Sequence, residues 1–173
     1  MKRWKMLITA ALILGGWWMT PDKPASAACA NGSYDLLDND NNQLNSPDNS
    51  YSGNWVHASS SLSYRSEHRY LASSPSSGSS DYSWIFPSCS NLYGSLYVYI
   101  DNTKFTNANA VYRMYNNSSQ VLSTSLNQRY AARGWNYAGK TPGAKTGKVV
   151  LSVPSGQLGG TGADAVKVLY SSN

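Results

Sequence analysis

The sequence predicts an all-β fold, a single antiparallel β-sandwich, and three observations support this. After residue 27, no segment repeats apolar residues at the helical spacing for long enough to form an amphipathic helix, because Ser, Asn, Gly and Pro interrupt the pattern. Short apolar or alternating runs lie between turn residues instead, which is typical of a sandwich or a barrel. All 13 tyrosines follow residue 27, in sequence rich in Ser, Asn and Gly and low in Lys and Glu, as in secreted β-proteins.

The first 27 residues are typical of a cleaved signal peptide. A basic start precedes an uncharged apolar run of 14 residues, Met6 to Met19, which is shorter than the roughly 20 residues that span a bilayer. Small residues at Ala25 and Ala27 favour cleavage after Ala27. Ser26 stands where a lipoprotein signal would need a Leu-like residue, so no lipid anchor is expected. We therefore expect one secreted domain, residues 28–173, that is extracellular, cell-wall-associated or periplasmic.

Charge and cysteine content exclude some classes of partner and predict a disulfide. Residues 28–173 carry ten basic and eight acidic side chains, so most of the chain's net charge of +5 belongs to the leader. This distribution argues against a nucleic-acid partner, which requires a concentrated basic patch. Cys29 and Cys89 form an even pair in an oxidising compartment, which predicts one disulfide; two free thiols are the alternative.

The second half of the domain shows the clearest strands. Residues 92–100 alternate strictly, with aliphatic side chains on one face and Tyr93, Tyr97 and Tyr99 on the other. A strand over 108–115, a turn at 116–119 and a third strand through 122–126 predict a hairpin. Further strands are expected at 134–138, 149–153 and 163–170.

The first half is less regular. Four strands are predicted at 34–37, 54–59, 69–72 and 82–86. The turn-rich segments between them, 38–52 and 73–80, are expected to be loops, because strands resume directly on both sides.

The tyrosine row is the main candidate for binding. Exposed rings stack on the apolar faces of sugars and other flat ligands, so Tyr93, Tyr97 and Tyr99 would form a ligand platform. The alternative is a cross-strand-paired or buried surface without a ligand. Trp55, Trp84 and Trp135 lie beside apolar strand residues, which predicts structural positions in the core.

A Ca²⁺ site is the single cofactor that the sequence raises. Asp38, Asp40 and Asn42 alternate like the start of a calcium loop, but Gln43 replaces the required Gly and Asn49 the bidentate Glu. An Asx-rich turn without a metal needs fewer assumptions.

Catalytic residues are scarce. After residue 27 the chain has two histidines, His57 and His68, and one glutamate, Glu67, with no G-x-S-x-G motif. Neither a zinc set nor a pair of carboxylates for glycoside hydrolysis stands out. No catalytic residue is therefore predicted, and a small hydrolase remains the least favoured alternative.

The order of several short motifs resembles a known family. They are 34–40 (YDLLDND), 53–55 (GNW), 82–86 (YSWIF), 94–100 (GSLYVYI), 110–112 (AVY), 134–135 (GW), 147–151 (GKVVL) and 162–168 (GADAVKV). Together they resemble the golvesin C-terminal-like domain, also described as the xanthan lyase carbohydrate-binding-like domain, over residues 34–170. The family implies a galactose-binding-like jelly roll that binds glycans or mediates adhesion without catalysis. The family does not supply binding residues that transfer to this chain.

Two departures from the family pattern stand out. The domain is expected to stand alone, whereas the family is usually appended to secreted bacterial enzymes and surface proteins. Asn136 to Gly139 follow Trp135 in place of the usual Leu-Gly.

Asp164 lies in an otherwise apolar strand, where a buried carboxylate would have a structural role and accept hydrogen bonds.

We therefore expect a secreted, non-catalytic module that binds extracellular polysaccharide or cell-wall glycan. The alternative from another class is a secreted adhesion, matrix or inhibitor-like protein that binds a protein partner.

Overall fold

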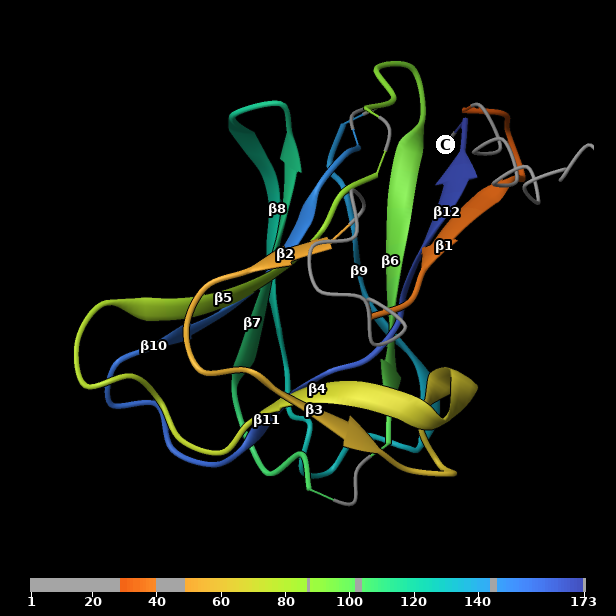
Figure 1. The fold of residues 1–173 in the computed structure, drawn as a ribbon. Helices are drawn as coiled ribbons and strands as arrows, with labels where there is room; N and C mark the ends of the chain where they lie inside the picture. The colour runs from red at the N-terminus through yellow and green to blue at the C-terminus, as the bar shows by residue number, and fades with distance from the viewer. Residues whose placement is uncertain (1–28, 40–48, 87, 102–103, 144–145, 173) are drawn as a thin grey trace, which may run out of the picture.

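The computed structural model describes residues 29–39, 49–86, 88–101, 104–143 and 146–172. The predicted signal peptide and its cleavage site lie outside these residues. Within them, twelve strands form antiparallel sheets packed as a sandwich, which confirms the all-β prediction (Figure 1). One short 3-10 turn, η1 (Tyr64–Ser66), interrupts the strands. In the described part of the chain, no helix has the length and apolar character that crossing a membrane requires.

Two sheets form the layers of the sandwich. The four-stranded sheet has the order β1-β12-β6-β9 and the five-stranded sheet the order β2-β5-β10-β7-β8. The first comprises β1 (Tyr34–Leu37), β12 (Val166–Ser171), β6 (Tyr93–Ile100) and β9 (Gly134–Lys140). The second comprises β2 (Asn49–Tyr51), β5 (Ser79–Trp84), β10 (Val149–Pro154), β7 (Ala110–Asn116) and β8 (Ser119–Leu126). At one edge the two sheets meet, where the Thr124 hydroxyl of β8 donates to the Ala138 carbonyl of β9 at 2.6 Å.

A third, small sheet crosses one end of the sandwich. It has the order β11-β4-β3, from β11 (Thr161–Ala163), β4 (Glu67–Leu71) and β3 (Val56–Ser59). Figure 1 shows β3 and β4 running across the ends of β6 and β7. Gly162 of β11 lies so close to Phe105 that a Cβ atom there would meet its ring at 2.0 Å, so this approach requires glycine.

The core lies between the inward faces of the two large sheets. Period-two alternation places every second residue there, and the largest fully buried side chains come from both layers. They include Trp84, Tyr82 and Tyr112 from the five-stranded sheet and Tyr170, Leu96 and Ile100 from the four-stranded sheet. Tyr170 is satisfied because its hydroxyl donates to Asp35 Oδ2 at 2.7 Å.

The disulfide prediction is confirmed. Cys29 and Cys89 are bonded, and their sulfurs link the start of the domain to the segment before β6. Cys89 also forms a two-way backbone bridge with Thr146. The bond therefore ties the chain just before β1 to the middle of the molecule.

Most predicted strands are present, with three corrections. The strand expected at 163–170 is two strands, because the chain turns at Asp164 and Ala165 and changes sheet. A short strand, β2, lies in the segment 38–52 that was expected to be a loop. β5 begins at Ser79, inside the predicted serine-rich loop. In both missed cases pairing with a neighbouring strand outweighs weak local propensity.

The predicted hairpin is present in β7 and β8. The turn between them uses Asn117, whose φ of 54° lies in the left-handed region that Asn tolerates.

Candidate functional site

The tyrosines of β6 lie on the outward face of the four-stranded sheet. Leu96, Val98 and Ile100 are at most 1% exposed on the inward face, so alternation turns Tyr93, Tyr97 and Tyr99 outward, half-buried. The sequence placed these rings together on one face, and the structure shows the same arrangement.

The neighbouring strands enlarge this row into a wider surface. Register sets Lys167 of β12 and Tyr137 of β9 on either side of Tyr97, and Trp135 beside Tyr99. Tyr34 of β1 lies beyond β12. We call this surface the aromatic face and define it by Tyr34, Tyr93, Tyr97, Tyr99, Trp135, Tyr137, Lys140 and Lys167.

The rings of the aromatic face contact one another edge to face. Tyr97 and Tyr137 lie 5.5 Å apart between centroids, and Tyr99 and Trp135 lie 5.3 Å apart at 85°. Tyr64 of η1 closes the end of the row, with its centroid 5.6 Å from both Tyr99 and Trp135. Such tilted pairs are favourable because the positive edge of one ring meets the negative face of another. The rings are therefore held in fixed orientations before any ligand arrives.

Two ammonium groups lie over these rings. Lys167 Nζ is 4.8 Å from the ring centroid of Trp135, 5.0 Å from Tyr97 and 5.9 Å from Tyr34. Lys140 Nζ lies 4.9 Å from the ring of Tyr93. These are cation–π distances, so both lysines contribute to holding the rings in place.

The aromatic face is open at its margins. Tyr34 is 55% exposed and Tyr137 57% exposed, whereas the central rings are half-buried by their neighbours. Trp135, which was expected in the core, lies on this face and is only partly buried. By contrast, Trp55 and Trp84 are core residues, at 5% and 0% exposure. The prediction was wrong for Trp135 because its strand, β9, is an edge strand with an outward register partner, Tyr99.

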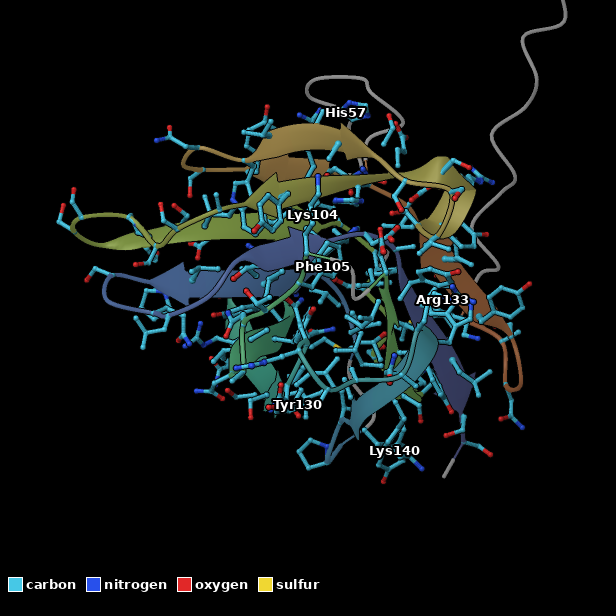
Figure 2. All side chains as sticks on the ribbon, turned by 90° about the horizontal axis from the view of Figure 1, so that it is seen from below. His57, Lys104, Phe105, Tyr130, Arg133 and Lys140 are labelled. Carbon is cyan, nitrogen blue, oxygen red and sulfur yellow. A yellow bond between two sulfur atoms is a disulfide. The ribbon has the colours of Figure 1, made fainter. Side chains whose placement is uncertain are left out.

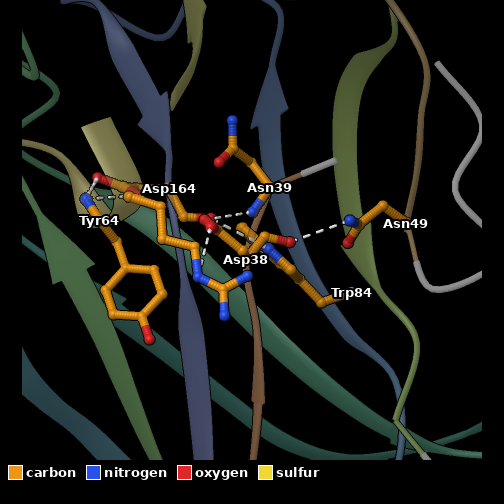
Figure 3. Close-up of polar contacts among 7 residues, drawn as sticks. Asp38, Asn39, Asn49, Tyr64, Trp84 and Asp164 are labelled. Atoms are coloured by element: carbon orange, nitrogen blue, oxygen red, sulfur yellow. Dashed lines mark hydrogen bonds and ion pairs between the residues drawn. The ribbon is translucent and has the colours of Figure 1, made fainter. Parts of the chain in front are cut away.

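Asp164 holds Tyr64, the ring at the end of the aromatic face, through the Tyr64 backbone. Asp164 is 1% exposed, and Figure 3 shows the Tyr64 N–H donating to its carboxyl group, with the nitrogen 3.2 Å from each oxygen. Its backbone carbonyl accepts the indole N–H of Trp84 at 3.2 Å. Burial raises the pKa of Asp164 to about 9, against the opposing hydrogen bond from Tyr64. The group is therefore neutral at neutral pH, and it connects η1 to the five-stranded sheet.

Of the three predicted calcium ligands, the structure describes only Asp38. Asp40 and Asn42 lie outside the described residues. Asp38 is buried; its Oδ1 accepts the Asn39 N–H at 2.9 Å, and its Oδ2 lies 3.9 Å from Arg65 Nε (Figure 3). Among the described residues, no group of three or more His, Cys, Asp or Glu side chains is placed to hold a metal ion. Calcium binding therefore stays an untested prediction.

A serine, a histidine and an aspartate meet behind the small sheet. Ser63 Oγ lies 2.7 Å from His68 Nδ1 and donates to Asp101 Oδ2 at 2.9 Å. Asp101 Oδ2 lies 3.5 Å from the same ring nitrogen. A catalytic triad needs the serine and the carboxylate on opposite ring nitrogens, whereas here both face Nδ1. His68 Nε2 is buried without a hydrogen-bond partner among the described residues, so the cluster does not have the geometry of a triad.

Burial governs the ionisation of this cluster. It lowers the pKa of His68, and the charge of Asp101 opposes this by raising it. The other histidine, His57, lies apart on β3, where Nε2 is 2.8 Å from Glu67 Oε2; Figure 2 shows it on the outer side of the small sheet.

Five members of the aromatic face were missed at the sequence level. Tyr34, Tyr137, Lys140 and Lys167 were not singled out, and Trp135 was assigned to the core. A signal existed, because Trp135 and Tyr137 are two residues apart in a strand and Lys167 alternates with Val166 and Val168. Period two places each of them on one face of its strand, but strand order, which brings the three faces together, comes from the structure.

Comparison with known proteins shows a likeness in fold. No protein-family model matches the sequence, and no curated protein matches it closely enough to be a relative. The structure is similar to that of a xanthan lyase from Paenibacillus, with a TM-score of 0.61 and 16% identity, over 80% of this chain and 13% of that one. It also matches the catalytic domain of a GH87 α-1,3-glucanase in complex with tetrasaccharides, at 10% identity and a TM-score of 0.46, over 81% of this chain and 28% of that one.

At these identities the likeness shows the fold alone. The chain therefore shares the fold of a part of the Paenibacillus xanthan lyase and covers only 13% of that protein's length. The narrower resemblance to the golvesin C-terminal-like family, with its galactose-binding-like jelly roll, stays a prediction.

Proposed function

We propose that this protein is a secreted, non-catalytic module that binds extracellular polysaccharide or cell-wall glycan through the aromatic face. The observation that carries the proposal is the gathering of six outward rings on one sheet. Aromatic rings supply a large, rigid apolar surface at a low cost in side-chain entropy, which suits the flat C–H faces of sugar rings.

The strand geometry favours a chain-like ligand. Successive outward residues on a strand lie roughly 7 Å apart, so Tyr93, Tyr97 and Tyr99 form a row along β6. Trp135 and Tyr137 form a second row on the adjacent β9. Two parallel rows of rings can contact several sugar units of one polymer, each contributing weakly, which is an economical way to bind a repetitive chain.

The fold comparison supports this function at a coarse level. The Paenibacillus protein that shares the fold is a xanthan lyase. The chain corresponds to a small part of that enzyme, as a binding module would. The non-catalytic assignment draws on the Ser63, His68 and Asp101 cluster, whose three side chains are buried and share one ring nitrogen.

Secretion is part of the proposal. The leader-like first 27 residues and the disulfide between Cys29 and Cys89 both fit an oxidising compartment. Together with a glycan-binding surface they favour a site of action at the cell surface, in the wall or in the surrounding matrix.

The test is retention on insoluble polysaccharides and isolated bacterial cell walls. The disulfide-bonded protein should be retained in a saturable way on at least one glycan, with heat-denatured protein as the control. The double variant Y97A/W135A removes one ring from each row, and we expect at least a tenfold loss of affinity, since two anchoring rings are commonly worth more than about 1.4 kcal/mol.

The matched control is Y115A. Tyr115 is a half-buried ring on the outward side of β7 in the other sheet, beside Lys148, and its loss should leave retention unchanged. Equal retention of the wild type and the double variant, with both folded by circular dichroism, would exclude the aromatic face as the binding site. Absence of retention on every glycan would favour a protein partner instead, sought by crosslinking in the native secretome.

A further inference from the structure

We propose that the aromatic face is selective for an acidic polysaccharide, and that Lys167 contacts the carboxylate groups of its uronic acid units. This inference rests on the proposed function, because it specifies the glycan that the same surface binds. It comes from the charge of the face, which the rings alone do not explain.

The four strands of this sheet carry three charged residues, and the negative and positive ones lie on opposite faces. They are Asp35, Lys140 and Lys167. Asp35 faces the core, is 8% exposed and accepts the Tyr170 hydroxyl at 2.7 Å. Both lysines face outward among the rings. The outward side of these strands therefore carries positive charge without a carboxylate of its own.

Lys167 occupies the centre of this surface. Its strand, β12, lies between β1 and β6, and three rings surround its ammonium within 6 Å. Among the described residues, no carboxylate forms an ion pair with it. Rings attract the cation through their quadrupoles but do not neutralise its charge, so its N–H donors and its field remain available to an anion.

Two cations lie at the ends of β9. Lys140 is at the end of β9 and contacts Tyr93. Arg133 directly precedes β9, and Figure 2 shows Arg133 and Lys140 at opposite ends of this strand. A polymer that carries an acid on every unit would meet more than one of these cations, whereas a neutral polymer would leave each of them solvated.

A uronic acid matches the combination of ring and ammonium. Its carboxylate is bonded directly to the sugar ring and projects from the edge of that ring. A sugar that stacks on the exposed ring of Tyr137, the neighbour of Tyr97, can therefore direct its carboxylate along the sheet surface toward Lys167 Nζ, which lies over the Tyr97 ring at 5.0 Å. The pairing is charge-assisted and adds to the stacking contact.

The experiment compares polymers that differ only in charge. Polygalacturonate and alginate are presented in native form and after reduction of their carboxyls to alcohols, and binding is measured by calorimetry at low salt. We expect the wild type to bind at least one native polyuronate about tenfold more tightly than its reduced form. The K167M variant should lose that tenfold preference, so that its affinities for the native and the reduced polymer become equal, and K167R should retain the preference.

The matched control is K148M. Lys148 Nζ lies 5.3 Å from the ring of Tyr115 on the other sheet, a similar local contact outside the aromatic face, and its replacement should change neither affinity. Near-ultraviolet circular dichroism and melting temperature show whether K167M keeps the rings in place, and K167R provides the second variant if it does not.

The outcomes separate this inference from the proposed function. Equal binding of native and reduced polymers, or a preference that K167M and K148M leave unchanged, would overturn the acidic selectivity and leave a neutral-glycan module. Failure to bind these polymers in either form, together with failure on the insoluble glycans and cell walls, would overturn both proposals.

Discussion

The two outward faces of the sandwich are built on the same plan and carry different chemistry. The four-stranded sheet turns six rings and two lysines outward. The five-stranded sheet turns out serines, valines and one pair of opposite charges, with Tyr115 as its one aromatic ring among the described residues. The serines are Ser50, Ser83, Ser123, Ser125 and Ser152, the valines Val111 and Val150, and the charged residues Asp81 and Arg113.

Both sheets bury a comparable apolar inward face, so the difference does not come from the core. The five-stranded sheet shows that a sheet of this fold forms with a single ring on its outward side, where Ser152 donates a hydrogen bond of 2.6 Å to Asp81 instead. The rings of the aromatic face are therefore more than the sheet requires. Part of their contribution is mutual packing, and the rest is available to a ligand; the predictions below separate these two contributions.

The largest expected effect comes from the disulfide, which supports one of the faces. Replacing both cysteines (C29S/C89S) opens a link across 60 residues, and we expect a loss of about 4 kcal/mol in the free energy of unfolding. Because β1 follows Cys29 closely and pairs only with β12, Tyr34 should leave the aromatic face first.

Hydrogen exchange checks this asymmetry. In C29S/C89S we expect faster exchange in β1, while β10 and β7 at the centre of the five-stranded sheet keep protection close to the global limit. The wild type with its disulfide intact is the control. Uniform acceleration in both sheets would mean that the bond stabilises the whole domain without a preference for the aromatic face.

The next effect is a pH dependence at the junction of the two layers. Asp164 has a pKa raised to about 9 by burial, with Asp38 and Asp101 adding to the rise and the Tyr64 N–H opposing it. In the unfolded chain the carboxyl loses its proton near pH 4, so between about pH 4 and pH 9 the folded state binds one more proton than the unfolded state. Its contribution to stability is therefore complete below about pH 4 and is lost as the pH rises through about 9.

The D164N variant tests this assignment. We expect the melting temperature of the wild type to fall more steeply with rising pH than that of D164N, whose side chain does not titrate. Asp38 and Asp101, whose charges add to the rise, are common to both proteins, so the difference between the two curves reports the titration of Asp164. Parallel curves would show that Asp164 does not keep its proton in the folded state.

The sequence predicted which residues of a strand share a face, but not which strands lie side by side to form the aromatic face. Alternation over 92–100 was sufficient to place Tyr97 and Tyr99 on one face, because strict period two has one solution. Trp135 was assigned wrongly since an isolated Trp beside apolar residues does not reveal whether its strand is central or at an edge. Lys167 was overlooked because its significance depends on β12 lying between β1 and β6, a long-range arrangement that local patterns do not encode.

A smaller effect compares one ring from each face. Tyr99 packs against two rings, Trp135 and Tyr64, whereas Tyr115 contacts one lysine. We expect Y99S to lower the free energy of unfolding by about 2 kcal/mol and Y115S by less than about 1 kcal/mol. Urea denaturation measures both. Equal losses would mean that the rings of the aromatic face do not stabilise one another.

The smallest expected effect comes from adding an aromatic ring to the outward side of the five-stranded sheet. Ser125 is exposed on β8, and its outward neighbour on β7 is Val111. S125Y should change stability by less than about 0.5 kcal/mol, because an exposed strand position accepts Tyr readily. It should also fail to restore glycan retention in the Y97A/W135A background, since a lone ring lacks the second row and the ammonium that Trp135, Tyr137 and Lys167 supply together. Restored retention would mean that any exposed ring is sufficient, and that the arrangement of the aromatic face does not determine binding.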